Sequence, residues 1–285
     1  MDRKKLAKKP NIIAIASIKG GVGKSTSSIM FSAILNKTSK VLLIDLDPQN
    51  AVTSYFITQD HPRMKLINIY NSYSLIKKEK TFKDVVINVS KNLDFIPSYL
   101  ELAKFSKEGN QFKELMLRNA LYNYLEDYDY VIIDTPPSLS SELDNALVIA
   151  DKVVIPVPLE RWAVENLPLL INQIKELENN FIGKETKIIH IFASKVETGR
   201  VASTEIMAVL KEKYPNKFIG EVHKSEALKK VIDYAIEPKG NENYYKEYLK
   251  ILENTYVRTY VRTYVRTYVR TYVRTYVRTY VRNNK

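Results

Sequence analysis

The stretch that decides the fold is NIIAIAS-IKGGVGKST, which runs from Asn11 to Thr26. Its apolar first half, Asn11–Ser17, predicts a short buried strand, and the residues from Ser25 to about Lys37 predict a helix. The glycine-rich loop between them is the setting that a phosphate-binding loop requires. Glycines let backbone N–H groups turn inward around an anion, and the helix N-terminus adds partial positive charge. The stretch therefore predicts a phosphate-binding site.

The loop departs from the common phosphate-loop spacing. The pattern GxxxxGK[ST] would need a glycine where this chain has Ile18, and the loop reads KGGVGKS with an additional lysine, Lys19. We expect Lys24 to meet the β- and γ-phosphates of a nucleotide, Ser25 to bind Mg²⁺ and Thr26 to bond a neighbouring phosphate. The predicted nucleotide contacts come from one continuous run: Lys19, Gly20, Gly21, Val22, Gly23, Lys24, Ser25 and Thr26.

Carboxylates follow two further apolar runs. Asp45 and Asp47 lie in IDLDPQ at the end of Val41–Leu46, and Asp134 begins DTPP after Tyr130–Ile133. Ligands of parallel sheets bind at the carboxyl ends of the strands, and a carboxylate beside a triphosphate requires a cation between them. A single acid that closes an apolar run is typical of a residue that holds Mg²⁺ through water. Any one of these acids, taken alone, could instead cap a helix.

Short apolar runs alternate with amphipathic segments along the chain. This pattern predicts an α/β fold, a mostly parallel sheet with helices on both faces, as in Rossmann-like P-loop NTPases. Further strands are expected at 93–96, 153–157, 187–193 and 217–221, and further helices at 111–126, 161–179, 202–214, 225–234 and 242–254. Residues 61–90 are polar, rich in lysine and weakly patterned, and they receive no assignment.

The composition excludes several classes of protein. The chain has 285 residues, of which 45% are hydrophobic, so most of it should be folded. It contains no cysteine, which excludes a disulfide scaffold, an iron–sulfur cluster and a cysteine nucleophile, and its three histidines argue against a His-rich metal site. No apolar run approaches the roughly 18–20 residues of a membrane-spanning helix, and the N-terminus does not resemble a signal peptide. We expect a cytoplasmic protein.

The net charge of +12 is concentrated at the two ends. Residues 1–10 carry +4 and residues 255–285 carry +8, which leaves the predicted nucleotide-binding domain, residues 11–254, neutral overall. Basic ends suggest nucleic acid or an anionic surface, or only a well-solvated terminus. Within the domain, residues 211–230 carry six lysines against three glutamates. Candidate DNA contacts are therefore Arg200, Lys211, Lys224, Lys229 and Lys230.

The last segment, residues 255–285, repeats Thr-Tyr-Val-Arg seven times and ends in Asn-Asn-Lys. In a helix, tyrosine and arginine would drift about 40° per repeat and leave no fixed apolar face, which argues against a membrane anchor. In a strand, tyrosine and arginine would share one face. Two interpretations stay open. The tail is either an expanded DNA repeat without a selected role or an arm that binds nucleic acid.

Taken together, KGGVGKST, IDLDPQ and IIDTPP resemble the deviant Walker A ATPases, KGGxGK[ST], of the ParA/MinD branch. The resemblance implies that Lys19 reaches the nucleotide of the other subunit in a dimer and that Asp47 positions the attacking water. It also implies that Asp45 and Asp134 lie near the metal with Ser25, and that Thr135-Pro136-Pro137 senses the γ-phosphate. Glu160–Leu167 resembles a family stretch ExxAxEGL, with Asn166 in place of glycine, and His223–Ala227 resembles a later one without its usual arginines.

Within this branch the segment DPQ and the helix predicted after it favour the ParA type. That resemblance implies a slow Mg²⁺-dependent ATPase for DNA partition, with ATP and Mg²⁺ as cofactors. It implies an ATP-dependent homodimer, non-specific DNA binding, a ParB-type centromere-binding partner and a nucleoid-associated location. Two alternatives remain: a MinD-like ATPase that acts at a membrane surface, and a nucleotide switch or scaffold that does not hydrolyse ATP. The nitrogenase iron protein shares the lysine but requires cysteine ligands, which this chain lacks.

Overall fold

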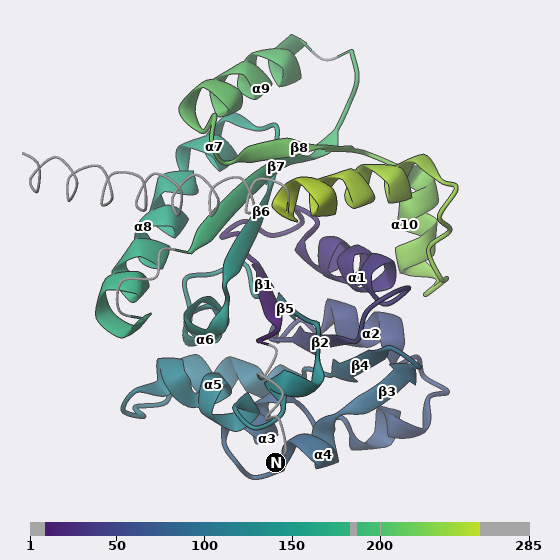
Figure 1. Cartoon of the computed structure of the whole chain (residues 1–285), viewed down its shortest axis with the longest axis vertical. Helices are drawn as coiled ribbons and strands as arrows, with labels where there is room; N and C mark the ends of the chain where they lie inside the picture. Colours follow the sequence, from purple (N-terminus) through teal and green to yellow (C-terminus); the bar gives the residue numbers. More distant parts are fainter. Residues whose placement is uncertain (1–8, 183–186, 200, 257–285) are drawn as a thin grey trace, which may run out of the picture.

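The computed structural model describes residues 9–182, 187–199 and 201–256 (Figure 1). In this part of the chain, eight strands form one sheet in the order β3-β4-β2-β5-β1-β6-β7-β8. All neighbouring strands are parallel except β3, which runs antiparallel to β4 at one edge. The strands are β1 (Asn11–Ile15), β2 (Val41–Asp45), β3 (Ile87–Ser90), β4 (Leu93–Ile96), β5 (Tyr130–Asp134), β6 (Lys152–Pro158), β7 (Ile188–Val196) and β8 (Phe218–His223).

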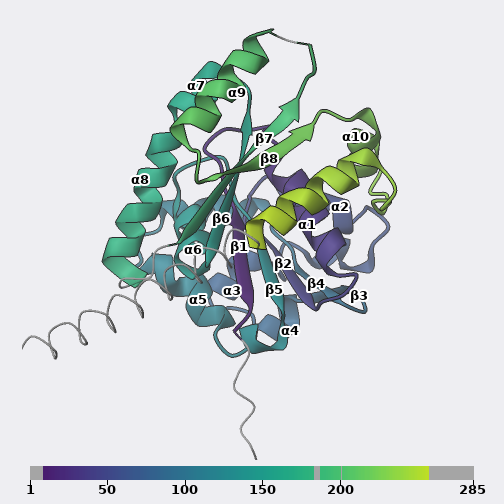
Figure 2. The ribbon, with the colours of Figure 1, turned by 45° about the horizontal axis from the view of Figure 1, so that its top comes forward.

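Helices cover both faces of the sheet, as the alternating pattern predicts (Figures 1 and 2). Side chains alternate along each strand, so in β1 Ile13 and Ile15 enter one core while Ile12 and Ala14 enter another. The first core is covered by α1 (Lys24–Leu35), α2 (Ala51–Phe56), α10 (Glu226–Asp233) and a helical segment over residues 243–256. The opposite face is covered by α3 (Ser72–Ile76), α4 (Phe82–Val85), α5 (Met116–Leu121), α6 (Ser141–Ile149), α8 (Leu167–Leu177) and α9 (Val201–Lys213).

Two of the predicted helices are wrong as continuous elements. Residues 161–179 form α7 (Arg161–Glu165) and then α8, followed by a π-helical turn at Glu178–Ile182. The break falls at Pro168, which has no N–H and therefore favours the first turn of a new helix. Residues 111–126 contain only the short helix α5, between 3₁₀ turns at Lys113–Leu115 and Leu125–Asp127.

The side chain of Asn145 in α6 explains the first of these 3₁₀ turns. Its amide nitrogen donates to the carbonyl of Lys113 at 2.8 Å, and its oxygen accepts from the N–H of Leu117 at 2.9 Å. A residue distant in sequence therefore fixes where α5 starts.

The unassigned segment 61–90 contains α3, α4, the edge strand β3 and a 3₁₀ turn at Pro62–Leu66. The remaining 3₁₀ segment spans Leu100–Lys107.

The first residues of the repeat array belong to the fold. The last described helix continues through Thr255, whose side chain is fully buried, and Tyr256. The ring of Tyr256 meets that of Tyr130 edge to face, with centroids 5.7 Å apart, and the Nζ of Lys152 lies 4.2 Å from its centroid. Burial lowers the pKa of Lys152 to about 8. Residues 257–285 and 1–8 lie outside the described residues.

We predict that Tyr256→Ala lowers the free energy of unfolding by about 2 kcal/mol, because it removes a largely buried ring together with its aromatic and cation–π contacts. Urea denaturation monitored by circular dichroism measures the change. Tyr260→Ala alters the same residue in the next copy of the repeat and serves as the matched control. Equal losses of unfolding free energy in the two variants would contradict a stabilising role that is particular to Tyr256.

Candidate functional site

The loop between β1 and α1 has the backbone shape of an anion-binding nest. Gly21 and Gly23 have φ angles of 71° and 94°, a left-handed conformation that glycine adopts without strain. Gly23 is the N-cap of α1 and supplies no side-chain cap, so the first-turn N–H groups have no capping side chain. A twelve-residue helix thus directs its partially positive end at the loop. This arrangement can bind a phosphate.

Lys24 places a buried cation beside this loop. Its side chain is 6% exposed, and its Nζ donates to the carbonyl of Lys19 at 3.3 Å. Burial lowers the pKa of Lys24, while the negative charges of Asp134 and Asp47 act in the opposite direction. A cation with so little water around it interacts strongly with an incoming phosphate.

Asp134 connects the loop helix to the centre of the sheet. It ends β5 and is fully buried, and its two oxygens accept hydrogen bonds from Ser25 Oγ at 2.7 Å and Ser28 Oγ at 2.8 Å. Burial raises the pKa of Asp134 from an ordinary 3.8 to about 6, although both hydrogen bonds act against the shift. The structure thus brings together two predicted Mg²⁺-site residues, Ser25 and Asp134.

Asp45 lies beside Asp134, since the two residues are in register on the neighbouring strands β2 and β5. Burial and the charge of Asp134 raise the pKa of Asp45 well above its ordinary value. Its oxygens accept from the N–H and hydroxyl of Thr53, at 2.9 and 2.8 Å, and from the N–H of Asp47 at 3.0 Å. Asp45 therefore accepts hydrogen bonds from the first turn of α2, as a helix-capping residue would.

Asp47 is buried just beyond the end of β2, and its side chain is 6% exposed. One oxygen accepts from the N–H of Gln49 at 2.9 Å. Burial raises the pKa of Asp47, and the charge of Lys24 partly offsets that effect. The three predicted carboxylates thus gather at the same end of the central strands as the phosphate loop.

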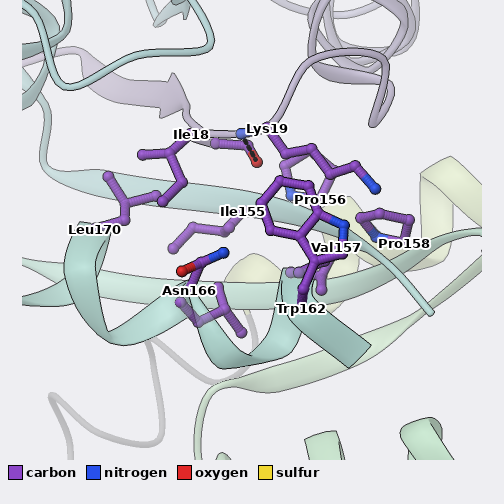
Figure 3. Close-up of a pocket in the computed structure, with 12 residues that line it drawn as sticks. Ile18, Lys19, Ile155, Pro156, Val157, Pro158, Trp162, Asn166 and Leu170 are labelled. Atoms are coloured by element: carbon purple, nitrogen blue, oxygen red, sulfur yellow. Dashed lines mark hydrogen bonds between the residues drawn. The ribbon is translucent and has the colours of Figure 1, made fainter. Parts of the chain in front are cut away.

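Lys19 does not share the position of Lys24. Its ammonium group forms an ion pair with Glu160. It also lies 4.9 Å from the ring centroid of Trp162, and Figure 3 shows these two side chains near each other. Glu160 is the N-cap of α7, and Trp162 lies in the first turn of that helix. Trp162 is half exposed and, with Ile18 and Leu170, lines a small cavity beneath the loop.

A cavity of about 330 Å³ adjoins the loop on the side of β7 and β8. Its walls combine Gly23 and Thr26 of the loop region with Lys195, His223 and Tyr248. Tyr248 is buried, and burial raises its pKa to about 12. The sequence does not predict this cavity, although it places His223 in a family-like stretch. Its only signal is that β7 and β8 also end at the sheet edge where ligands of parallel sheets bind.

Near Asp47 the turn Thr135-Pro136-Pro137 is tied to β1, because Thr135 Oγ1 donates to the carbonyl of Ile15 at 2.8 Å. A second cavity, of about 440 Å³, opens beside this turn and is lined by Pro48, Pro136 and Glu142 among others. Glu142 is a buried carboxylate that accepts from Ser106 Oγ at 2.6 Å, and sequence reasoning did not single it out.

The candidate DNA contacts that the structure describes lie on α9, on α10 and in the turn between β8 and α10. Lys224 and Lys229 line the cavity next to the phosphate loop, and Lys224 pairs with Glu197 at 2.9 Å. Lys230 is exposed on α10, and Lys211 on α9 lies 5.4 Å from the ring centroid of Phe218. Arg200 lies outside the described residues.

Among the helices that the structure describes, none has both the length and the apolar character needed to span a bilayer.

Comparison with known proteins matches residues 10–191 to a family model described as an AAA domain. The sporulation initiation inhibitor protein Soj of Bacillus subtilis is 32% identical, over 82% of this chain and 94% of Soj. The chromosome partitioning protein ParA of Myxococcus xanthus is also 32% identical, over 82% of this chain and 84% of that protein.

Solved structures show the same relationship. A protein described as a plasmid partition protein from Borrelia burgdorferi, crystallised with AMPPNP, is 39% identical and superposes with a TM-score of 0.79. The match covers 87% of this chain and 98% of that one. The ATP complex of a McdA variant from Cyanothece has a TM-score of 0.77 at 23% identity, a likeness that concerns the fold alone.

The burial of Asp134 predicts a pH-dependent stability in the nucleotide- and metal-free chain. Because folding raises this pKa from 3.8 to about 6, ionisation costs more in the folded than in the unfolded state. The contribution of this carboxyl group to the free energy of unfolding is fully present below about pH 4, and it is lost as the pH rises through about 6. Asp134→Asn has no carboxylate at this position and should not lose this stability. The difference between its free energy of unfolding and that of the native chain should therefore rise by about 2 kcal/mol between pH 4 and pH 8.

Urea denaturation at several pH values in the presence of a chelator measures this difference. Asp127→Asn, at an exposed position, is the control for the loss of a surface carboxylate. A constant difference for Asp134→Asn would contradict the account of the buried carboxylate.

Proposed function

The chain belongs to the family of ParA- and Soj-like partition ATPases, and we propose that it is a Mg²⁺-dependent ATPase that separates DNA copies. In this proposal two copies dimerise on ATP, the dimer binds DNA without sequence preference, and hydrolysis releases it. The observation that carries the proposal is the contact of Ser25 and Ser28 with the buried Asp134 at the mouth of a phosphate nest. A P-loop site for phosphoryl transfer needs a loop serine or threonine and a strand-end aspartate side by side, and here these would be Ser25 and Asp134.

The residues present suit Mg²⁺ and a nucleotide. Mg²⁺ is usually held by one or two carboxylates together with substrate phosphates, and Ser25 and Asp134 would supply the protein ligands, with Asp45 behind them. The buried ammonium of Lys24 would balance the phosphate charge. The cavity beside Gly23 and Thr26 would accept the nucleoside, since it joins the phosphate loop and combines apolar walls with polar groups. Bound ATP would supply the phosphoryl group that is transferred to water.

Asp47 would orient the attacking water. Its side chain is buried close to Lys24 and Asp134. Among the described residues it accepts a hydrogen bond from Gln49 and none from the phosphate loop, so it would not be needed to hold the phosphates. Burial raises its pKa, yet a carboxylate that faces Lys24 and a bound metal would remain a weak base. Positioning of water therefore explains its place better than proton removal.

DNA binding would depend on dimerisation. Residues 211–230 carry a local charge of +3, and a dimer would present two such patches. Release of counterions by these lysines makes binding independent of sequence and sensitive to salt. Dissociation would follow loss of the γ-phosphate, which the turn Thr135-Pro136-Pro137 would sense. The partner that stimulates hydrolysis would be a ParB-type DNA-binding protein, and the protein would act on the nucleoid.

Two lysine variants test the ATPase proposal. Lys24→Ala should abolish nucleotide binding, because a buried cation that faces the phosphates is lost. Lys19→Ala should bind nucleotide almost normally but fail to dimerise and to release phosphate. Binding of a fluorescent ATP analogue, sedimentation and phosphate release measure the three properties, with the exposed Lys37→Ala as control. Dimers of Lys19→Ala with ATP would rule out a role across the subunit boundary.

Truncation after Tyr256 separates the folded domain from the repeat array as the DNA-binding surface, and it retains the docked Thr255 and Tyr256. The truncated chain should keep ATP-dependent DNA binding and lose a nucleotide-independent background. Gel shifts at several salt concentrations measure both components, since each neutralised phosphate adds about 0.9 to the salt slope. Complete loss of ATP-dependent binding would move the DNA site to the tail.

A further inference from the structure

The side chain of Lys19 is held inside its own subunit. Its ammonium group pairs with Glu160 and lies 4.9 Å from the ring centroid of Trp162. The side chain of Lys19 is 20% exposed, although the loop glycines beside it are open to solvent. Glu160 is the N-cap of α7 and Trp162 lies in that helix, so one short segment of the chain provides both contacts.

This arrangement conflicts with the function proposed for Lys19. A lysine that completes the nucleotide site of another subunit must extend away from its own chain. It cannot at the same time keep its ion pair with Glu160 and its position against Trp162. Dimerisation therefore requires that these two contacts be broken once in each subunit.

We propose that Glu160 and Trp162 are positioning residues that hold Lys19 back in the single subunit and so set the concentration at which the ATP dimer forms. The inference rests on the proposed function, because it assumes that Lys19 crosses between subunits. Its chemistry is an exchange of partners. Lys19 leaves one carboxylate and one aromatic face, and it gains the more highly charged phosphates of a nucleotide in the other subunit.

The energetics favour a modest but measurable effect. Glu160 is about half exposed, at 53%, so the ion pair is partly screened by water. Pairs of this kind change an equilibrium by about two- to fivefold. Because two lysines are released for each dimer, the effect on the dimer dissociation constant is squared, to about four- to twenty-five-fold.

Glu160→Gln distinguishes a holding site from an interface residue. Loss of the ion pair in the single subunit should make the dimer tighter, by about four- to twenty-five-fold, whereas removal of an ordinary interface contact would make it weaker. Sedimentation of the full chain with Mg²⁺ and AMPPNP gives the dissociation constant without hydrolysis. Glu165→Gln is the matched control, because Glu165 is equally exposed, pairs with Arg161 within the same helix and should leave the constant unchanged.

The holding contact can be tested without nucleotide. Trp162 is the only tryptophan of the chain, and indole emission responds to nearby charge. Lys19→Ala should therefore change the emission of the nucleotide-free protein, and Lys175→Ala, at an exposed position of α8, should not. Thermal melts of all variants establish that they are folded. No change in the Lys19→Ala emission would mean that the contact does not form, and would overturn the proposal.

The possible outcomes separate the two levels of inference. A tighter dimer in Glu160→Gln, or a dimer that forms only in that variant, supports the holding role. If the native chain forms a dimer and Glu160→Gln forms one with an equal or larger dissociation constant, the holding role is overturned. The ATPase proposal then remains intact. If AMPPNP produces no dimer in the native chain or in either glutamine variant, the proposed function fails, and the exchange of partners fails with it.

Discussion

The hydrogen bonds from Ser25 and Ser28 to Asp134 are the constraint on which the site depends. A fully buried carboxylate is costly unless donors surround it, and here both donors come from the first turns of α1. They hold the N-terminal end of that helix against the end of β5. The register of β5 with β2 then places Asp45 alongside, and the loop that precedes α1 is held at the mouth of the site.

The sequence predicts the central strands well, because parallel strands covered on both faces must be continuously apolar, and the runs that precede Lys19, Asp47 and Asp134 have that character. It predicts less of the helical layer. The start of α5 depends on hydrogen bonds with Asn145, which lies 28 residues beyond Leu117 and leaves no trace in the local pattern. The segment 61–90 is made of elements too short for a periodic signal.

The same distinction applies within the site. Strand ends and a glycine loop are local features, so the meeting of Ser25 with Asp134 follows from topology once the strands are known. The Thr53 bonds of Asp45 and the pairing of Lys19 with Glu160 depend on side-chain packing between separate segments. Lys19 and Glu160 are 141 residues apart, and no spacing rule joins them. The two lysines of the loop thus have different environments, one buried among carboxylates and one at the surface against an aromatic ring.

The docking of Thr255 and Tyr256 has a consequence for the inheritance of the repeat array. All its units have the same sequence, so whichever unit follows Asn254 supplies the same threonine and the same tyrosine to the last turn of the fold. Each unit is a whole number of codons, and therefore its gain or loss preserves the reading frame. Slippage of the gene during replication can lengthen or shorten the tail, one arginine at a time, while the folded domain inherits an unchanged end.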